Sequence, residues 1–308
     1  MNLKGKDFLT LLDYDKSSIK NLIDLAQKLK EEKKKDKAHH ILEGKTLAMI
    51  FAKPSLRTRV SFEIGIRQLG GNAVVLKQDE IIPGERETIS DTARVLARYA
   101  DGIMIRTFAH KDVVEFASYS DVPVINALTD SFHPCQVLAD LLTIKEKFGK
   151  FENLKLAYIG DGNNMANSLL AGCAIMGINI SIATPEGYEP DEVHVWKCKD
   201  ATLSTGSTIE ITQNPAESVK DANVVYTDVW ASMGQEQEIK KRKKVFKDYQ
   251  INEALMKEAA KDAIVLHCLP AHRGEEISEE TLEKHANIIF EQAENRLHAQ
   301  KAVMASIM

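Results

Sequence analysis

Two arginines and two hydroxyl residues are crowded at one point of the sequence, the stretch Ser55 to Arg59, which reads SLRTR. An apolar run, Thr46 to Ala52, comes shortly before them. A helical pattern of apolar residues follows, with Val60, Ile64 and Leu69 expected on one side of the helix. The N-terminus of a helix attracts negative charge, so arginines at that position suit a bound anion such as phosphate or carboxylate. The alternative is that the serine is an ordinary N-cap beside two solvated arginines.

Polar clusters occur at five more places, each where an apolar run ends. They are Arg106, Asp130 to Gln136, Gly160 to Asn164, Asp228 to Gly234 and His267 to Gly274. In open parallel sheets, ligands bind beyond the carboxyl ends of the strands. With the first cluster included, each half of the sequence contributes three. This distribution favours one shared site in a cleft between two domains.

Short apolar runs alternate with helical patterns along the whole chain. We expect strands at 46–52, 73–76, 102–106, 122–128, 154–160, 179–185, 209–213, 223–230 and 263–270. Helices expected between them include Thr88 to Tyr99, Pro134 to Phe148, Asn164 to Met176 and Ile251 to Lys261. Uninterrupted apolar strands separated by helices predict an α/β fold, with mostly parallel sheets covered by helices on both faces.

The length of 308 residues is typical of two domains. The polar segment Lys147 to Lys155 carries Gly149 and marks the expected boundary. We therefore predict one domain at 1–148 and a second at 149–291. The last helix, at about 292–308, is expected to pack back on the first domain.

Composition excludes several classes of protein. The formal net charge is −5, so no overall positive field attracts nucleic acid. The longest basic run, Ile239 to Lys247, is expected to be a solvated loop or helix face. No apolar run approaches the roughly 20 residues that span a bilayer, and the first residues lack the features of a signal peptide. These observations predict a cytoplasmic protein without a membrane partner.

Several motifs have a structural interpretation beside a functional one. The cysteines are scattered without a CxxC pair, which argues against a zinc site or a disulfide framework. The stretch GDGNN begins like a dinucleotide-binding fingerprint, but Met165 occupies the third glycine position. Asn163 and Asn164 could cap the next helix or bind a zwitterion. His133 precedes a proline and could be a structural hydrogen-bonding residue, and Cys268 could be a small buried apolar side chain.

Taken together, four motifs resemble those of the carbamoyltransferases. They are SLRTR at Ser55 to Arg59, HPCQ at His133 to Gln136, DVWASMG at Asp228 to Gly234 and HCLPAHRG at His267 to Gly274. Within this family the whole chain resembles the ornithine carbamoyltransferases, since aspartate carbamoyltransferases carry neither HCLP nor SMG in this form. The resemblance implies that carbamoyl phosphate and L-ornithine give L-citrulline and phosphate, most often in arginine biosynthesis. It also implies a homotrimer of two-domain subunits without a metal or organic cofactor.

The resemblance implies roles for individual residues. Those that would bind carbamoyl phosphate are Ser55, Leu56, Arg57, Thr58, Arg106, His133, Gln136, Cys268, Leu269 and Arg296. Those that would bind L-ornithine are Asn164, Asp228, Ser232 and Met233. The catalytic residues among these would be Arg57, Thr58, Arg106, His133 and Cys268. A cis peptide bond between Leu269 and Pro270 is typical of the family.

The implied chemistry suits these residue types. When the neutral δ-amine of ornithine attacks the carbamoyl carbon, negative charge develops on the carbonyl oxygen. Thr58, Arg106 and His133 would stabilise that charge, and the helix start would stabilise the departing phosphate. Asp228 would hold the α-amino group of ornithine. Cys268 would either assist proton removal or only align the amine.

Two places depart from the usual family pattern. Leu56 stands where many members have a threonine. In the loop 77–88, Ile81 and Ile82 stand near the position of a glutamine or histidine that many members donate to the neighbouring subunit, and Gln78 lies too early to replace it.

Three alternatives to the ornithine reaction stay open. The acceptor of the carbamoyl group could be aspartate, putrescine or an acylated ornithine. The protein could be a dinucleotide-dependent oxidoreductase built on GDGNN. It could also be a catalytically silent binding protein.

Overall fold

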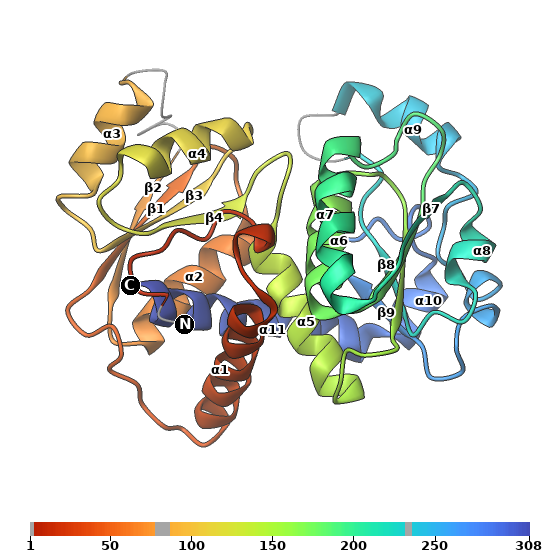
Figure 1. Cartoon of the computed structure of the whole chain (residues 1–308), viewed down its shortest axis with the longest axis horizontal. Coiled ribbons are helices and arrows are strands. Elements are labelled where there is room, and N and C mark those ends of the chain that lie inside the picture. Colours follow the sequence, from red (N-terminus) through yellow and green to blue (C-terminus); the bar gives the residue numbers. More distant parts are fainter. Residues whose placement is uncertain (1–2, 78–86, 232–235) are drawn as a thin grey trace. The chain divides into compact units, whose positions relative to one another are not determined.

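The computed structural model describes residues 3–77, 87–231 and 236–308 (Figure 1). The chain divides into two compact units. Unit 1 consists of Met1–Leu142 and Glu294–Met308, and unit 2 consists of Thr143–Ala293. All nine strands expected from the sequence are present, and every pairing between them is parallel. The α/β prediction is confirmed.

Unit 1 is built on a sheet of four parallel strands in the order β2-β1-β3-β4. The strands are β1 (Thr46–Phe51), β2 (Asn72–Leu76), β3 (Gly102–Arg106) and β4 (Val124–Leu128). A short 3-10 helix at Leu11–Asp13 comes first. The helices that follow are α1 (Lys16–Lys34), α2 (Leu56–Gln68), α3 (Ile89–Leu96), α4 (His110–Tyr119) and α5 (Pro134–Phe148), the last of which ends in unit 2. The part of α11 (Ala286–Ile307) from Glu294 onward also belongs to unit 1.

Helices cover both faces of this sheet. Helices α3 and α4 lie on one face, and α1 and α2 lie on the other (Figure 1). Alternate residues of the strands, such as Ile50 and Ile103, pack with Val113 and Phe116 of α4 in one buried cluster. Such an arrangement follows from right-handed crossovers, because the chain moves one way across the sheet from β1 to β2 and the other way from β2 onward.

The buried face of α2 differs from the face expected from the sequence. Phe62 and Ile66 are buried, whereas the side chains of Val60 and Ile64 are 43% and 41% exposed. The expectation that Val60, Ile64 and Leu69 share one side is therefore wrong. Leu69 is buried, but it is the C-cap and lies just beyond the last helical residue. A periodic apolar pattern was present, but it belonged to the exposed side of the helix.

Unit 2 is built on a sheet of five parallel strands in the order β7-β6-β5-β8-β9. The strands are β5 (Lys155–Ile159), β6 (Asn179–Ala183), β7 (Ile209–Thr212), β8 (Val224–Thr227) and β9 (Ile264–His267). The helices are α6 (Asn164–Met176), α7 (Glu192–Thr205), α8 (Pro215–Val219), α9 (Ile239–Val245) and α10 (Glu279–Lys284), with 3-10 helices at Glu236–Glu238 and Leu255–Lys257. Helices α6 and α7 lie on one face of the sheet and α8 on the other (Figure 1).

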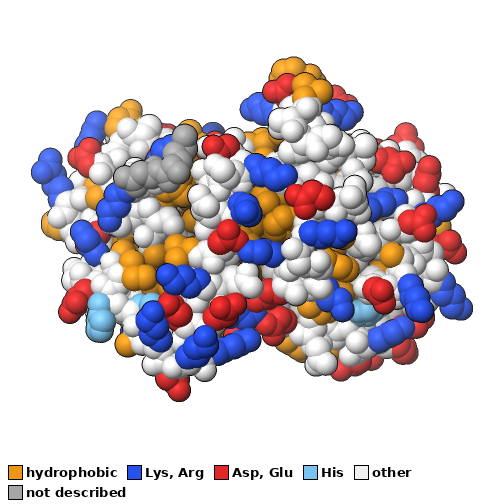
Figure 2. Space-filling model, turned by 60° about the horizontal axis from the view of Figure 1, so that its bottom comes forward, with side chains coloured by type: hydrophobic (Ala, Val, Ile, Leu, Met, Phe, Trp, Pro, Cys, Tyr) orange, Lys and Arg blue, Asp and Glu red, His pale blue; other side chains and the backbone are white. Residues whose placement is uncertain are grey.

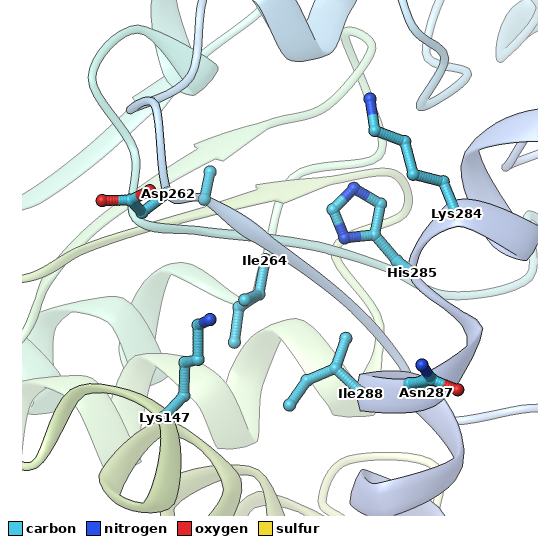
Figure 3. Close-up of a pocket in the computed structure, with 8 residues that line it drawn as sticks. Lys147, Asp262, Ile264, Lys284, His285, Asn287 and Ile288 are labelled. Atoms are coloured by element: carbon cyan, nitrogen blue, oxygen red, sulfur yellow. The ribbon is translucent and has the colours of Figure 1, made fainter.

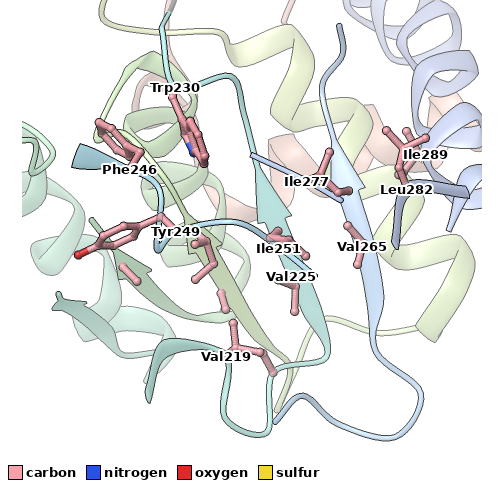
Figure 4. Packing of buried hydrophobic residues seen from close by; sticks show 14 residues of the cluster. Val219, Val225, Trp230, Phe246, Tyr249, Ile251, Val265, Ile277, Leu282 and Ile289 are labelled. Carbon is pink, nitrogen blue, oxygen red and sulfur yellow. The ribbon is translucent and has the colours of Figure 1, made fainter. Parts of the chain in front are cut away.

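The helix expected at Ile251 to Lys261 is wrong. Only the 3-10 turn Leu255–Lys257 forms there. Ile251 instead makes a parallel β-bridge with Ile277 and is fully buried. Figure 4 shows it in the same apolar cluster as Val225 and Val265 of the sheet. Burial of this side chain and its backbone pairing override the local helical pattern.

The basic run Ile239 to Lys247 forms α9 and its end. Its lysines are exposed, which confirms the expectation of a solvated helix face. Arg242 is the exception, because it is buried and binds Asp161 at 2.7 Å. Side chains of both charges are interspersed over the surface drawn in Figure 2. In the described ranges, no helix is both long and apolar enough to cross a bilayer.

Candidate active site

The direction of strand succession reverses once in each sheet, and the polar clusters follow the strands at that point. In unit 1 the reversal lies between β1 and β3, where Phe51 pairs with Arg106. In unit 2 it lies between β5 and β8, where Ile159 pairs with Thr227. Ligands bind at such switch points because the loops leave the sheet in opposite directions there. Each unit therefore carries one candidate half-site.

In unit 1, the N-terminus of α2 faces the first half-site. Ser55 is the N-cap, and its Oγ accepts a hydrogen bond from the Thr58 N–H at 3.2 Å. The interpretation of Ser55 as an N-cap is confirmed. It is compatible with anion binding, because helix geometry leaves the N–H groups of Leu56 and Arg57 without an intrahelical acceptor. The hydroxyl hydrogen of Ser55 is a further donor.

Four of the expected residues, Thr58 among them, form one hydrogen-bonded group. The Thr58 Oγ1 accepts from Arg106 at 3.5 Å and from Arg296 at 3.4 Å. Arg296 also donates to Gln136 Oε1 at 2.7 Å. The Gln136 amide is oriented by its other end, which donates to Asp140 at 2.9 Å. Elements far apart in the sequence (α2, β3, α5 and α11) thus bring two buried guanidinium groups to one helix start.

His133 lies in the same positive environment. Burial is the main cause that holds its pKa well below the usual 6.5, followed by the positive charges of Arg296, Arg106, Arg57 and Lys53. The imidazole is therefore neutral at physiological pH and can donate one hydrogen bond without adding charge. Four cations acting on one buried histidine produce a field that stabilises an anion.

Lys53 is a residue that the sequence reasoning did not assign to the site. It is buried, its Nζ lies 2.8 Å from Asp130, and it stands 4.2 Å from the centre of the Phe108 ring. Burial lowers its pKa. The available signal was its position directly after the first strand, beside the arginines.

In unit 2, Asp228 is the centre of the second half-site. Its Oδ1 accepts from the Val229 N–H at 2.8 Å and from the Cys268 thiol at 3.0 Å. Its Oδ2 accepts from the Asn163 side chain at 3.0 Å. Cys268 is partly exposed, so the interpretation as a fully buried apolar side chain is wrong.

The two asparagines of GDGNN have different roles. Asn163 is the N-cap of α6, since its Oδ1 accepts from the N–H groups of Met165 and Ala166. Its amide nitrogen holds Asp228, a contact that sequence reasoning missed. Asn164 is the first residue of α6 and stands beside this pair.

The glycine of GDGNN that precedes the asparagines has a packing reason. A Cβ atom on Gly162 would overlap the backbone of Tyr188 to Pro190. Asp161 is bound to Arg242. Local packing therefore accounts for this stretch without a pyrophosphate.

Cys268 and Leu269 follow β9 directly, and Thr227 at the end of β8 pairs with His267 at the end of β9. The expected cis peptide bond between Leu269 and Pro270 is confirmed. Leu269 has a φ of 57°, a left-handed conformation that a residue with a Cβ rarely adopts.

Some expected site residues lie outside the described residues. They are Ser232 and Met233 of the second half-site, and Gln78, Ile81 and Ile82 of the loop that departs from the family pattern. Across 3–77, 87–231 and 236–308, no three His, Cys, Asp or Glu side chains gather as metal ligands do.

A surface pocket of about 290 Å³ in unit 2 is separate from these half-sites. Figure 3 shows Lys147, Ile264 and His285 among its lining residues. Ile264 begins β9, so the pocket lies at the opposite end of that strand from Cys268. It contains none of the expected site residues.

Two family models match successive parts of the chain. Residues 6–146 match the family model described as the aspartate/ornithine carbamoyltransferase, carbamoyl-P binding domain. Residues 152–307 match the model of the aspartate/ornithine carbamoyltransferase, Asp/Orn binding domain.

Individual relatives match over the whole chain. The ornithine carbamoyltransferase of Anoxybacillus flavithermus is 56% identical, with 100% of this chain and 98% of that protein covered. The solved structure of the Pyrococcus furiosus ornithine carbamoyltransferase is 49% identical, with a TM-score of 0.97 and coverage of 100% and 98%. The anabolic enzyme of Campylobacter jejuni is 46% identical, with a TM-score of 0.92 and 97% of each chain covered. The chain belongs to the aspartate/ornithine carbamoyltransferase family.

Proposed function

We propose that this protein is an ornithine carbamoyltransferase. It transfers the carbamoyl group of carbamoyl phosphate to the δ-amine of L-ornithine and releases L-citrulline and phosphate. The observation that carries the proposal is the convergence of four cations on a buried, neutral histidine beside a helix N-terminus. Relatives named ornithine carbamoyltransferase at 49–56% identity support it.

Unit 1 is the proposed carbamoyl phosphate-binding domain. The phosphate binds at the start of α2 through the N–H groups of Leu56 and Arg57, the hydroxyl of Ser55 and the Arg57 guanidinium. Its departure as inorganic phosphate is favoured by the same donors, because they interact with growing negative charge.

The carbonyl oxygen of the carbamoyl group is bound by Thr58, Arg106 and His133. Attack by the amine places negative charge on this oxygen, and donors that are already in position stabilise it without reorganising. The neutral state of His133 fits this role, since its N–H can donate while the two arginines near Thr58 supply the charge. Gln136 positions Arg296 by accepting from its guanidinium.

Unit 2 is the proposed L-ornithine-binding domain. Asp228 holds the α-ammonium group, and Asn164 binds the amino-acid end of the substrate together with Ser232 and Met233. A carboxylate suits an acceptor that has a free α-amino group, which favours ornithine over an N-acylated ornithine.

Cys268 and Leu269 are proposed to align the δ-amine. The Cys268 thiol donates its hydrogen to Asp228, and a thiol sulfur can also act as a weak acceptor for an N–H group. Nucleophilic attack requires the neutral amine, so a proton must leave before or during transfer. This geometry favours alignment of the amine by Cys268 over proton removal, because the thiol is itself a hydrogen-bond donor here.

The protein is further proposed to be a cytoplasmic homotrimer that works in arginine biosynthesis. The names of relatives from Pyrococcus furiosus and Campylobacter jejuni include the word anabolic. All four cysteines are free thiols, as is usual in the cytoplasm. An exposed apolar stripe on α2, formed by Leu56, Val60 and Ile64, suits contact with another subunit. Light scattering at three times the chain mass of 34.4 kDa supports the trimer, and a monomer mass contradicts it.

Citrulline formation by the purified protein tests the reaction. Carbamoyl phosphate is supplied with L-ornithine, and parallel reactions contain aspartate, putrescine or N-acetylornithine. We expect activity with ornithine as the acceptor and none with the other three acceptors. Activity with a different acceptor alone would retain the role of unit 1 and contradict the role of Asp228. No activity with any of the four would contradict the proposed function.

A further inference from the structure

A buried histidine–glutamate pair lies directly beside the second half-site. His267 is the last residue of β9 and immediately precedes Cys268. Its Nε2 lies 3.0 Å from Oε1 of Glu276, and both side chains are 0% exposed. Neither residue contacts a proposed ligand in the mechanism above. A carboxylate in a fully buried place is costly, so its presence there calls for a physical reason.

The hydrogen bonds fix the tautomer of the imidazole. The Nδ1 atom of His267 is 2.8 Å from the N–H of Leu269. A backbone N–H can only donate, so Nδ1 accepts and carries no proton. The proton is therefore on Nε2, where it is donated to Glu276. A carboxylate, an imidazole and a backbone amide form one chain of hydrogen bonds that ends at Leu269.

Glu276 is itself held firmly. Its Oε1 also accepts from the N–H of His272 at 2.6 Å. Its carbonyl oxygen accepts from the N–H of Ile251 at 2.9 Å, and Ile251 forms a β-bridge with Ile277. Glu276 Oε1 thus ties His267 and His272 together across the loop that contains Cys268 and Leu269.

This series of hydrogen bonds ends at Leu269, a residue with a strained backbone conformation. Leu269 has a φ of 57°, which is unfavourable for an L-residue with a Cβ. The bond from its N–H to the imidazole helps to hold that conformation. The neighbouring Cys268 Sγ then lies 3.0 Å from Asp228 Oδ1. Rotation of the imidazole would break the hydrogen bond to the Leu269 N–H, directly beside the residue that contacts Asp228.

We propose that His267 and Glu276 are positioning residues for the acceptor half-site. Glu276 fixes the neutral imidazole of His267, and the imidazole fixes the Leu269 amide and holds Cys268 against Asp228. Their expected effect on ornithine binding rests on the proposed function, whereas their expected effect on the reactivity of the Cys268 thiol does not. If the pair had a merely structural role, its loss would lower the stability of the protein without selectively changing the KM for ornithine or the reactivity of the Cys268 thiol.

Variants of His267 separate the two ends of the chain of hydrogen bonds. In His267→Asn, the side-chain oxygen takes the place of Nδ1 and can still accept from Leu269. In His267→Gln, the polar atoms reach toward Glu276 and the acceptor near Leu269 is lost. Glu276→Gln keeps an acceptor for the imidazole and removes the charge. His194→Gln is the matched control, because His194 is also buried in unit 2 and its Nε2 lies 2.7 Å from the backbone oxygen of Asn167.

The first measurement is kinetic. In His267→Gln the KM for ornithine is expected to rise about tenfold, the effect of one lost hydrogen bond, while the KM for carbamoyl phosphate changes less than about twofold. His267→Asn is expected to recover most of the loss, and Glu276→Gln to be intermediate. His194→Gln is expected to lower the melting temperature without separating the two KM values. Equal changes in both KM values, or no rescue by asparagine, would overturn the proposal.

The second measurement does not need activity. Alkylation of Cys268 by iodoacetamide is followed by peptide mass spectrometry, and the other three cysteines are buried and serve as internal references. The alkylation rate at Cys268 is expected to rise several-fold in His267→Gln, and to stay at the wild-type value in His194→Gln. If His267→Gln does not fold, Glu276→Gln and His267→Asn carry the comparison. An altered rate in a protein without carbamoyltransferase activity retains the positioning role and rejects the proposed function. An unchanged rate in folded variants rejects the positioning role.

Discussion

The two half-sites stand at equivalent places in two parallel sheets and have opposite electrostatic character. In unit 1, Arg106, Arg296 and a helix N-terminus surround a neutral histidine. In unit 2, the equivalent place holds the carboxylate of Asp228, an amide and a thiol. Topology therefore sets the location of each half-site, and the residues after the strands set its charge.

This difference corresponds to the charges of the two proposed substrates. Carbamoyl phosphate is an anion and needs donors and positive charge, whereas the α-ammonium of ornithine needs an acceptor with negative charge. Neutral groups are kept where charge would compete. His133 is held neutral among arginines. The following variants test whether the two half-sites act separately on the two substrates.

The largest effect is expected from the arginines of unit 1. Arg57→Ala and Arg106→Ala should each lower kcat/KM by about 10³-fold, because each removes a charged donor for the phosphate or the developing oxyanion. Arg59→Ala is the matched control, since this side chain is half exposed and pairs with Glu63 on the surface of α2. Steady-state rates near the wild-type value in both site variants would contradict the assignment.

A smaller effect, confined to the acceptor, is expected from Asp228→Asn. Asparagine can still accept from Cys268, but the negative charge for the α-ammonium is lost. The KM for ornithine should rise about 10- to 100-fold, the usual effect of a hydrogen bond to a charged group. The KM for carbamoyl phosphate should not change. Asp200→Asn, on the exposed side of α7, is the control. A loss shared equally by both substrates would show that the two half-sites are not independent.

The titration of His133 tests the positive field directly. Because burial and four cations lower its pKa, the histidine should remain neutral well below pH 6.5 in the ligand-free protein. An unfolded chain binds this proton below about pH 6.5 and the folded chain does not, so His133 lowers the stability as the pH falls below that value.

Bound inorganic phosphate should raise the pKa of His133, because its charge offsets the cations. Histidine NMR signals measured with and without phosphate give both values, and His133→Gln identifies the resonance. If the His133 signal titrated with a midpoint near pH 6.5 that did not change when phosphate was added, the basis for an anion site would be removed.

The smallest effect is expected from Leu56→Thr. The Leu56 side chain is 75% exposed, so we expect this residue to contribute its backbone N–H to the site and not its side chain. A hydroxyl at this position should change the KM for carbamoyl phosphate by less than about threefold, within the range of a surface substitution. A much larger gain in affinity would mean that the hydroxyl itself binds the phosphate.

Much of this architecture was readable in the sequence. Apolar runs and their polar ends gave all nine strands, and α5 and α6 begin and end where their patterns predict. Regular periodicity and strong capping residues such as Asn163 make these elements locally determined. The residue types at the strand ends also indicated an anion site in the first half of the chain.

Other features depended on contacts between distant residues. Ile251 joins a β-bridge and a buried cluster, so its segment does not form the expected helix. The periodicity of α2 could not show which of its apolar rows would be buried. Both outcomes are decided by the partner surface, which a local pattern does not contain.

The sequence by itself determined the fold class, the places where chemistry could occur and the residue types available there. Only the tertiary structure decided which side chains meet: Arg296 with Thr58, Asn163 with Asp228, and Glu276 with His267. These pairs are separated by 238, 65 and 9 positions in the chain. Strand propensity and capping act over a few residues, whereas the partner of a buried charge is selected by the packing of whole sheets and helices.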